Sequence, residues 1–104
     1  MMMSARIKIL PILLMFCTSS FAQQASELFN QALSKAQSGD MEGAIADFDR
    51  SLELESSNAN AYYWRGLAKA SIGQTTEAIS DFGLATQQNP NFGDAYLRRG
   101  TLYN

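Results

Sequence analysis

The sequence predicts an all-α protein made of antiparallel helix-turn-helix repeats that stack as an α-solenoid. Three observations support this fold class. The chain repeats itself with a period of 34 residues, each full unit has a Gly near its middle, and apolar residues recur at helical spacing on both sides of that Gly. About two and a half units fit between residues 25 and 104.

The first 22 residues indicate an export signal that is separate from the repeats. Arg6 and Lys8 give a positive start, an apolar run follows, and residues 20–22 (Ser-Phe-Ala) have the small-x-small pattern of a cleavage site. The apolar run is much shorter than the roughly 20 residues that span a bilayer as a helix. We therefore expect a cleaved signal peptide over residues 1–22, no transmembrane anchor, and a mature domain over residues 23–104.

A second export route remains open at this stage. Lipidation of Cys17 would replace cleavage after Ala22, although bulky Phe16 stands where lipoprotein signals carry a small residue. Both routes place the protein outside the cytoplasm. We expect a periplasmic or secreted protein, and the short signal favours a bacterial envelope.

The composition of residues 23–104 disfavours nucleic acid as a partner. These residues include six basic and ten acidic side chains, a net charge of −4, and the basic ones cluster no further than Arg98-Arg99. Nucleic-acid binding normally requires a basic patch that displaces counterions from phosphates. Cys17 is the only cysteine and leaves with the signal, so the stability of the domain must come from packing.

The register of the repeat needs no gap. It aligns unit one (25–58) with unit two (59–92), and it places the start of a third unit (93–104) at Gly93. The residues of unit one that recur unchanged in unit two are Ala25, Leu33, Lys35, Ala36, Gly39, Ala44, Ile45, Asp47 and Phe48. The residues of unit two that recur in the partial third unit are Ala61, Tyr62, Arg65 and Gly66.

Each full unit is expected to form two helices. In unit one we expect helices over about 25–37 and 41–55 with a turn at residues 38–40, and in unit two the turn falls at residues 72–74. Pro90 ends unit two, because proline disfavours helical geometry in the residue before it. The stripes expected to face the core are Ala44, Ile45, Phe48 and Leu52 in unit one, and Ala78, Ile79, Phe82 and Ala85 in unit two. The residues expected to be small because helices approach closely are Ala32, Ala44, Gly66, Ala78 and Gly100.

Unit two resembles the tetratricopeptide repeat, a helix-turn-helix motif of the same length. Arg65 and Lys69 depart from the Leu and Tyr of that pattern, and in unit one Ser51 and Ser56 replace an alanine and the proline. The resemblance covers residues 25–104. It implies a concave face that receives an extended peptide or a partner helix. The matching residues are Tyr62, Gly66, the Ala78-x3-Phe82 pair, Ala85 and Pro90.

Helical geometry indicates which residues of the first helices face this groove. At 100° per residue, Trp64 points away from the arc that contains Tyr62 and Arg65. Exposed Trp and Arg are typical of binding hot spots, whereas Tyr63, Phe29 and Leu33 fit interhelix packing equally well. The predicted partner-binding residues are Phe29, Asn30, Leu33, Tyr63, Trp64, Leu67, Leu97, Arg98 and Thr101.

Some proteins of the tetratricopeptide family hold the terminal carboxylate of a partner with Lys, Asn and Arg side chains from three first helices. Asn30 and Arg98 match such positions in this chain. Phe29, Trp64 and Asp94 stand where further polar or basic ligands are expected. The resemblance therefore implies an apolar or aromatic partner segment rather than a terminal carboxylate.

The mature domain lacks the side chains that catalysis most often uses. It contains no His and no Cys, so the usual general base, thiol nucleophile and commonest metal ligands are absent. Asp47 and Asp81 recur with the repeat, which favours a solvated or interhelix role. We expect no enzyme activity, no cofactor and no metal, and a protein or peptide as the partner.

The third unit leaves its function open. Tyr96, Gly100 and Tyr103 keep the pattern that receives a following helix, whereas a terminal cap would present a polar face. Three interpretations remain open for the helix of the third unit. It is a terminal cap, it belongs to the N-terminal fragment of a longer repeat protein, or a second copy of the chain covers its surface in a homodimer. The two functions that fit are a groove-binding module and a self-associating structural subunit of an envelope assembly.

Overall fold

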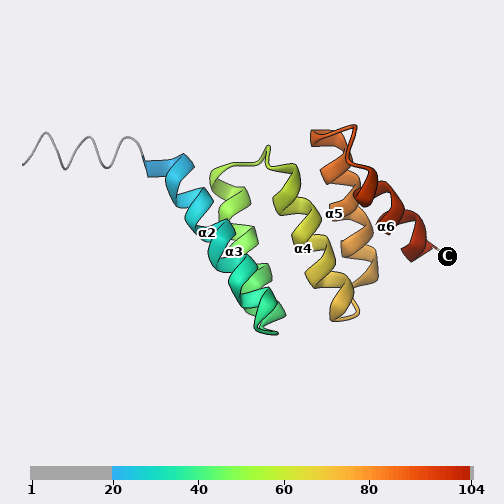
Figure 1. The fold of residues 1–104 in the computed structure, drawn as a ribbon, viewed down its shortest axis with the longest axis horizontal. Coiled ribbons are helices and arrows are strands. Elements are labelled where there is room, and N and C mark those ends of the chain that lie inside the picture. Colours follow the sequence, from blue (N-terminus) through green and yellow to red (C-terminus); the bar gives the residue numbers. More distant parts are fainter. Residues whose placement is uncertain (1–19, 104) are drawn as a thin grey trace, which may run out of the picture.

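The computed structural model describes residues 20–103 as a row of five helices with no strand among them (Figure 1). Helix α2 packs against α3, and α4 packs against α5. The two pairs are joined by contacts between α3 and α4, and α6 packs against α5. The predicted all-α stack of helix pairs is confirmed. The helices are α2 (Ser20–Gln37), α3 (Met41–Leu54), α4 (Ala59–Ser71), α5 (Thr75–Gln88) and α6 (Gly93–Tyr103).

Both predicted turns occur at a glycine with left-handed backbone geometry. Gly39 has a φ of 94° and Gly73 a φ of 86°, a conformation that costs other residues energy. After the first turn, Asp40 accepts a hydrogen bond at 2.9 Å from the backbone N–H of Gly43 and so caps α3. Gln74, at the equivalent position of unit two, makes no such side-chain bond.

Helix α2 begins at Ser20, earlier than the expected start near Ala25. Residues 21–24 are exposed, and Ala25 is buried. The early start therefore lengthens the helix without enlarging the core. Residues 1–19, which include Cys17 and most of the predicted signal peptide, lie outside the described residues. Cleavage after Ala22 stays a prediction.

The core consists of two apolar clusters, one for each helix pair. In the first, Phe48 of α3 is fully buried among residues of α2 and α4. In the second, Phe82 of α5 packs against α4 and α6. Ile45 and Ile79 are only half-buried, while the other predicted stripe residues are confirmed as core. These core residues are Ala44, Phe48, Leu52, Ala78, Phe82 and Ala85.

Small residues allow the two helices of a pair to approach closely. A Cβ added to Gly66 would lie 2.8 Å from Cε1 of Phe82, which is too close for any side chain. Ala32, Ala44 and Ala78 are fully buried, as expected. In α6 the equivalent of Gly66 is Gly100, and nothing described lies within 4 Å of a Cβ at that position.

Two hydrogen bonds involve the serines that depart from the repeat pattern in unit one. The hydroxyl of Ser51 donates to the carbonyl oxygen of Ala25 at 2.7 Å, and this links α3 to α2 inside the core. The hydroxyl of Tyr62 donates to the carbonyl oxygen of Ser56 at 2.9 Å and fastens the connection between units. The polar hydroxyl of Ser51 is therefore satisfied although it is buried.

Candidate partner-binding groove

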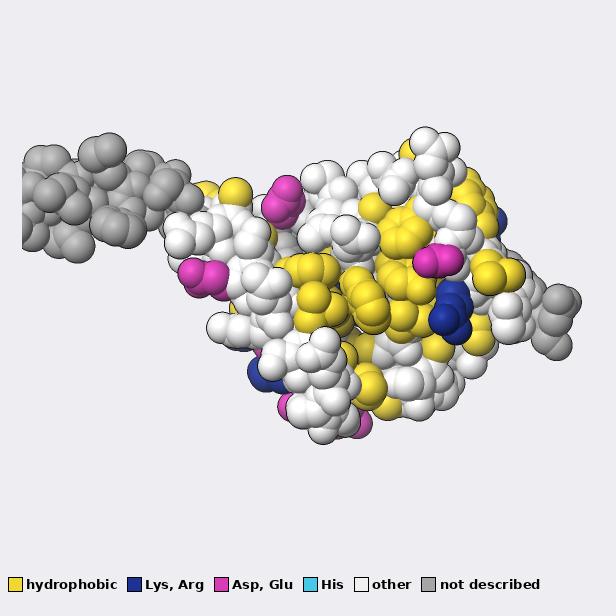
Figure 2. Space-filling view, in the orientation of Figure 1, with side chains coloured by type: hydrophobic (Ala, Val, Ile, Leu, Met, Phe, Trp, Pro, Cys, Tyr) yellow, Lys and Arg dark blue, Asp and Glu magenta, His cyan; other side chains and the backbone are white. Residues whose placement is uncertain are grey.

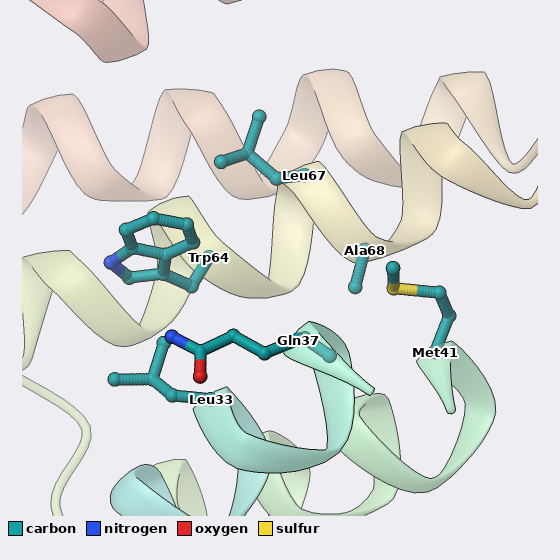
Figure 3. A pocket seen from close by; sticks show the side chains of 7 residues that line it. Leu33, Gln37, Met41, Trp64, Leu67 and Ala68 are labelled. Atoms are coloured by element: carbon teal, nitrogen blue, oxygen red, sulfur yellow. The ribbon is translucent and has the colours of Figure 1, made fainter. Parts of the chain in front are cut away.

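An apolar pocket of about 260 Å³ lies between the first helices of the two full units, α2 and α4 (Figure 3). The indole of Trp64, from α4, lies over Leu33 and Gln37 of α2, whereas Leu67 points away from them. Leu33 and Gln37 form the α2 side, and Met41 at the start of α3 closes one end. We call this the first pocket, and its lining residues are Leu33, Ala36, Gln37, Met41, Trp64, Leu67 and Ala68.

Helical spacing explains how the sequence builds the first pocket. Trp64, Leu67 and Ala68 are separated by three and four residues, so they share one face of α4. Trp64 remains 41% exposed, and the ring of Tyr63 meets its indole edge-on with centroids 5.5 Å apart. Ala68 has a short side chain, which leaves space beside the indole. The groove therefore presents a large aromatic surface next to a hollow.

A second, smaller hollow of about 100 Å³ lies between α4 and α6. Leu67 separates it from the first pocket, because this side chain lines both. Thr101 also lines it, and its hydroxyl donates to the carbonyl oxygen of Leu97 at 2.8 Å. We call this the second pocket, and its lining residues are Leu67, Ala70, Phe82, Arg98, Thr101 and Leu102.

The predicted partner-binding residues do not all reach the pockets. Five of the nine line one or both, and these are Leu33, Trp64, Leu67, Arg98 and Thr101. Asn30 and Leu97 are exposed but line neither.

Tyr63 and Phe29 belong mainly to the core. Tyr63 is 8% exposed and stacks on Phe92 with ring centroids 4.8 Å apart. Phe29 is half-buried, and its ring lies 5.8 Å from that of Phe48. Their aromatic surface is largely occupied by other parts of the chain. The packing alternative left open for these two residues is the one that the structure favours.

Seven lining residues are absent from the predicted set: Ala36, Gln37, Met41 and Ala68 in the first pocket, and Ala70, Phe82 and Leu102 in the second. Ala68 lies four residues after Trp64, and Ala36 lies three after Leu33, so the same helical spacing contained their signal. Met41 belongs to α3, and its approach to the pocket depends on the turn at residues 38–40. Sequence periodicity within one helix carries no information on such a contact.

Apolar side chains gather across the middle of the face shown in Figure 2, over the region of α4. White polar groups surround them, and near α6 a basic side chain lies beside an acidic one. Contiguous apolar surface with a polar border is typical of interaction sites.

A buried carboxylate joins the helices of unit one. Asp47 of α3 is 1% exposed, and its Oδ2 lies 2.8 Å from Nζ of Lys35 on α2. Arg50 donates from Nη2 to Oδ1 of Asp47 at 2.9 Å. The ammonium of Lys35 holds the pKa of Asp47 below its ordinary value against the opposing effect of burial, and Arg50 lowers that pKa further. The interhelix role expected for Asp47 is confirmed.

Unit two repeats this arrangement and extends it to unit one. Arg65 of α4 donates to Asp81 of α5 from Nε at 2.8 Å and from Nη2 at 2.6 Å, and Nζ of Lys69 lies 3.2 Å from the same carboxylate. Nη1 of Arg65 also donates to Oδ1 of Asp49 on α3 at 2.8 Å. Burial of Arg65 disfavours its charge, but the bonds to both aspartates outweigh this and raise the pKa of Arg65. These contacts hold α4 with Trp64 turned toward the groove.

Within residues 20–103, no helix is long and apolar enough to cross a membrane. The same part of the chain has no group of three His, Cys, Asp or Glu side chains placed to hold a metal ion.

Comparison with known proteins agrees with the fold. A model described as TPR repeat matches residues 32–73, and one described as Tetratricopeptide repeat matches residues 59–92. No significant match was found among curated proteins.

Several solved structures are similar to this chain. The second TPR of Spaghetti (RPAP3), bound to the HSP90 peptide SRMEEVD, is 27% identical with a TM-score of 0.76, and the match covers 79% of this chain and 76% of that one. MamA is 26% identical with a TM-score of 0.75, and the match covers 77% of this chain but 47% of MamA.

The TPR2B domain of yeast Sti1, in its complex with pHsp70, is also similar. It is 26% identical with a TM-score of 0.74, and the match covers 77% of this chain and 64% of that one. The glycine turns, the Ala-x3-Phe cores, the family models and these structures all lead to the same result. Residues 32–92 are built of tetratricopeptide repeats.

Proposed function

We propose that this chain is an exported protein–protein interaction module that binds a peptide or a segment of a partner protein in its concave groove. The observation that carries the proposal is the half-exposed indole of Trp64 beside an apolar pocket of about 260 Å³. A bulky side chain of a partner would bury apolar surface on both the indole and Leu67. The peptide complexes formed by similar repeat structures support this use of the groove.

Site-specific photo-cross-linking tests the proposal. A photoreactive amino acid at Gln37, in the first pocket, should cross-link a partner peptide from envelope extract, and Trp64→Ala should lower the yield. The matched control carries the same group at Glu53, an exposed residue of α3 that lines neither pocket. Equal cross-linking from both positions, or none from Gln37, would contradict groove binding.

The export part of the proposal rests on the pattern of the first 22 residues. Expression of the full chain in a bacterium, followed by mass spectrometry of the intact product, should show a protein that begins at Gln23. Ala22→Arg places a large charged residue at the cleavage site and should block processing. An unprocessed cytoplasmic product from the unmodified chain would contradict export.

A second candidate function is self-association through α6. Arg99 lies 5.4 Å from the centre of the Tyr96 ring on α6, and Arg65 lies 5.6 Å from the centre of the Tyr62 ring on α4. The two helices thus share this arrangement, but α4 packs against the following helix α5. Tyr96 is 43% exposed. A second copy that covers this surface would give a dimer in light scattering, and Gly100→Leu would return it to monomer. A monomer at every concentration would contradict this candidate.

A further inference from the structure

The two pockets of the groove occupy equivalent positions in the repeat. Leu33 and Ala36 of the first pocket become Leu67 and Ala70 of the second after a shift of one repeat. The remaining α4 residues of the first pocket have their counterparts in α6. These pairs are Trp64 with Arg98, Leu67 with Thr101, and Ala68 with Leu102. The same backbone framework therefore presents two sites, which differ by these three substitutions on the second of the two helices and by Gln37 and Met41, which line only the first pocket.

The substitutions change both the size and the chemistry of the site. Leu102 stands in place of Ala68 and fills space, which fits the smaller volume of the second pocket, about 100 Å³ against about 260 Å³. Arg98 replaces the indole of Trp64, and Thr101 replaces the side chain of Leu67. The first pocket thus favours a bulky apolar group, and the second offers hydrogen-bond donors.

Arg98 differs from Arg50 and Arg65, which form ion pairs within the described residues. Arg50 and Arg65 are bound to aspartates of α3 and α5, whereas no carboxylate among residues 20–103 lies within ion-pair distance of Arg98. Its side chain is exposed at the edge of the second pocket. Asp94 lies one helical turn earlier on α6 and is the nearest acidic position along that helix. A guanidinium in this setting can bind a carboxylate in bidentate geometry.

The width of α4 sets the distance between the two pockets. The two pockets lie on either side of α4 and share Leu67, so one helix diameter, about 10 Å, separates them. An extended chain advances about 3.3 Å per residue, so about three residues connect one pocket to the next.

We infer that the groove selects an extended partner segment with a bulky apolar side chain in the first pocket and an acidic side chain, about three residues away, on Arg98. This inference rests on the proposed function and adds the chemistry of the partner. The segment is recognised through side chains, so it lies inside a chain as readily as at its end. The apolar wall at Trp64 and the cation at Arg98 complement these two groups.

Selection from a library of short random peptides tests the inference without assuming a partner. The unmodified chain should enrich peptides with a Leu, Ile, Met or Phe and, about three residues away, an Asp or Glu. Enrichment without an acidic residue at this spacing would overturn the inference, as would no enrichment above background.

Trp64 makes the follow-up measurement direct, because it is the only Trp in the sequence. Titration of its fluorescence with an enriched peptide should show affinity about tenfold higher than for the same peptide with Gln in place of Glu. In Arg98→Gln the two peptides should bind alike. A preference for Glu that survives in Arg98→Gln would place the carboxylate elsewhere and contradict the inference.

Two further variants probe each pocket separately. Ala68→Leu copies the residue found at the equivalent position of α6 and fills part of the first pocket. A variant that circular dichroism shows to be folded should therefore lose the preference for a bulky apolar side chain. Asp94→Asn removes the acidic group nearest along the helix and should strengthen binding of the Glu peptide. Tight binding of the apolar peptide to Ala68→Leu would overturn the assignment of the first pocket.

The outcomes separate this inference from the proposed function. If Gln37 cross-links a partner but the enriched peptides lack the apolar and acidic pair, groove binding stands and the inference is wrong. If Gln37 gives no cross-link and Trp64 fluorescence responds to no peptide, both are wrong.

Discussion

Units one and two each bury an aspartate at the same position of the repeat, but different cations neutralise the two carboxylates. Asp47 is neutralised by Lys35 and Arg50, whose side chains are 43% and 61% exposed. Asp81 is neutralised by Arg65 and Lys69, whose side chains are 15% and 16% exposed. The cations around Asp47 can turn to water when their partner is removed, whereas those around Asp81 cannot do so without moving helices.

This difference shows how a repeat array varies locally while its frame stays the same. The Lys–Asp pair recurs in both units, so it belongs to the repeat itself. Arg65 is an addition to unit two, and unit one has Gln31 at that position. Through Asp49 it links α4 to the preceding unit. The orientation of Trp64 in the groove therefore depends on contacts made on the packing face of the same helix.

The largest effects are expected at the equivalent core phenylalanines. Phe48→Ala and Phe82→Ala should each lower the free energy of unfolding by about 3 to 5 kcal/mol, because both rings are almost completely buried. Chemical denaturation followed by circular dichroism measures this. The two units share this part of the core, so the two values should be similar. An unchanged transition for either variant would show that its cluster does not hold the fold.

Substitution of the buried aspartates should lower the free energy of unfolding more in unit two than in unit one. Asp81→Ala leaves Lys69 without a carboxylate and Arg65 with Asp49 alone, in a largely buried place, and should cost about 3 to 5 kcal/mol. Asp47→Ala releases cations that reach water and should cost less, about 1 to 3 kcal/mol. The same denaturation experiment ranks the variants. Equal losses of unfolding free energy in the two variants would contradict the proposed difference between the units.

Larger side chains where two helices pack closely should lower the free energy of unfolding by an intermediate amount. Ala78→Leu should cost about 1 to 3 kcal/mol, because Ala78 is fully buried where α5 meets α4. Ala44→Leu is its counterpart in unit one and should behave alike. A gain in stability from either change would mean that the helices are less tightly packed than the structure shows.

Low pH should lower the free energy of unfolding through protonation of Asp47, by less than the substitutions above. The pKa of this carboxyl is lower in the folded state than its unfolded value of about 3.9, so its contribution is complete above that value and is lost as the pH falls through the folded pKa. Unfolding free energies measured below about pH 4 should therefore fall more steeply in the unmodified chain than in Asp47→Asn. Parallel curves would contradict the ion-pair assignment.

Much of the fold could be predicted because repeat proteins rely on local patterns. The turns at Gly39 and Gly73 and the Ala-x3-Phe stripes depend on short-range spacing, and all were predicted. The groove was predicted only in part. Trp64 follows from helical geometry, but the burial of Tyr63 depends on Phe92, which lies nearly thirty residues further along the chain.

The ion pairs show the same limit. Recurrence marked Asp47 and Asp81, yet the link from Arg65 to Asp49 depends on how one unit rests on the next. No periodicity within a helix contains that information. Contacts between residues that lie far apart in the sequence, both within a unit and between units, are the ones that sequence reasoning could not predict.

The most direct test of the account is a pair of measurements on Trp64→Ala. The packing face of α4 supports stability and its groove face supports binding, so this change should leave the free energy of unfolding within about 0.5 kcal/mol of that of the unmodified chain. Binding of a cross-linked or selected partner should fall at least tenfold, as expected for loss of an aromatic hot spot. A large loss of stability, or undiminished binding by the folded variant, would contradict the account.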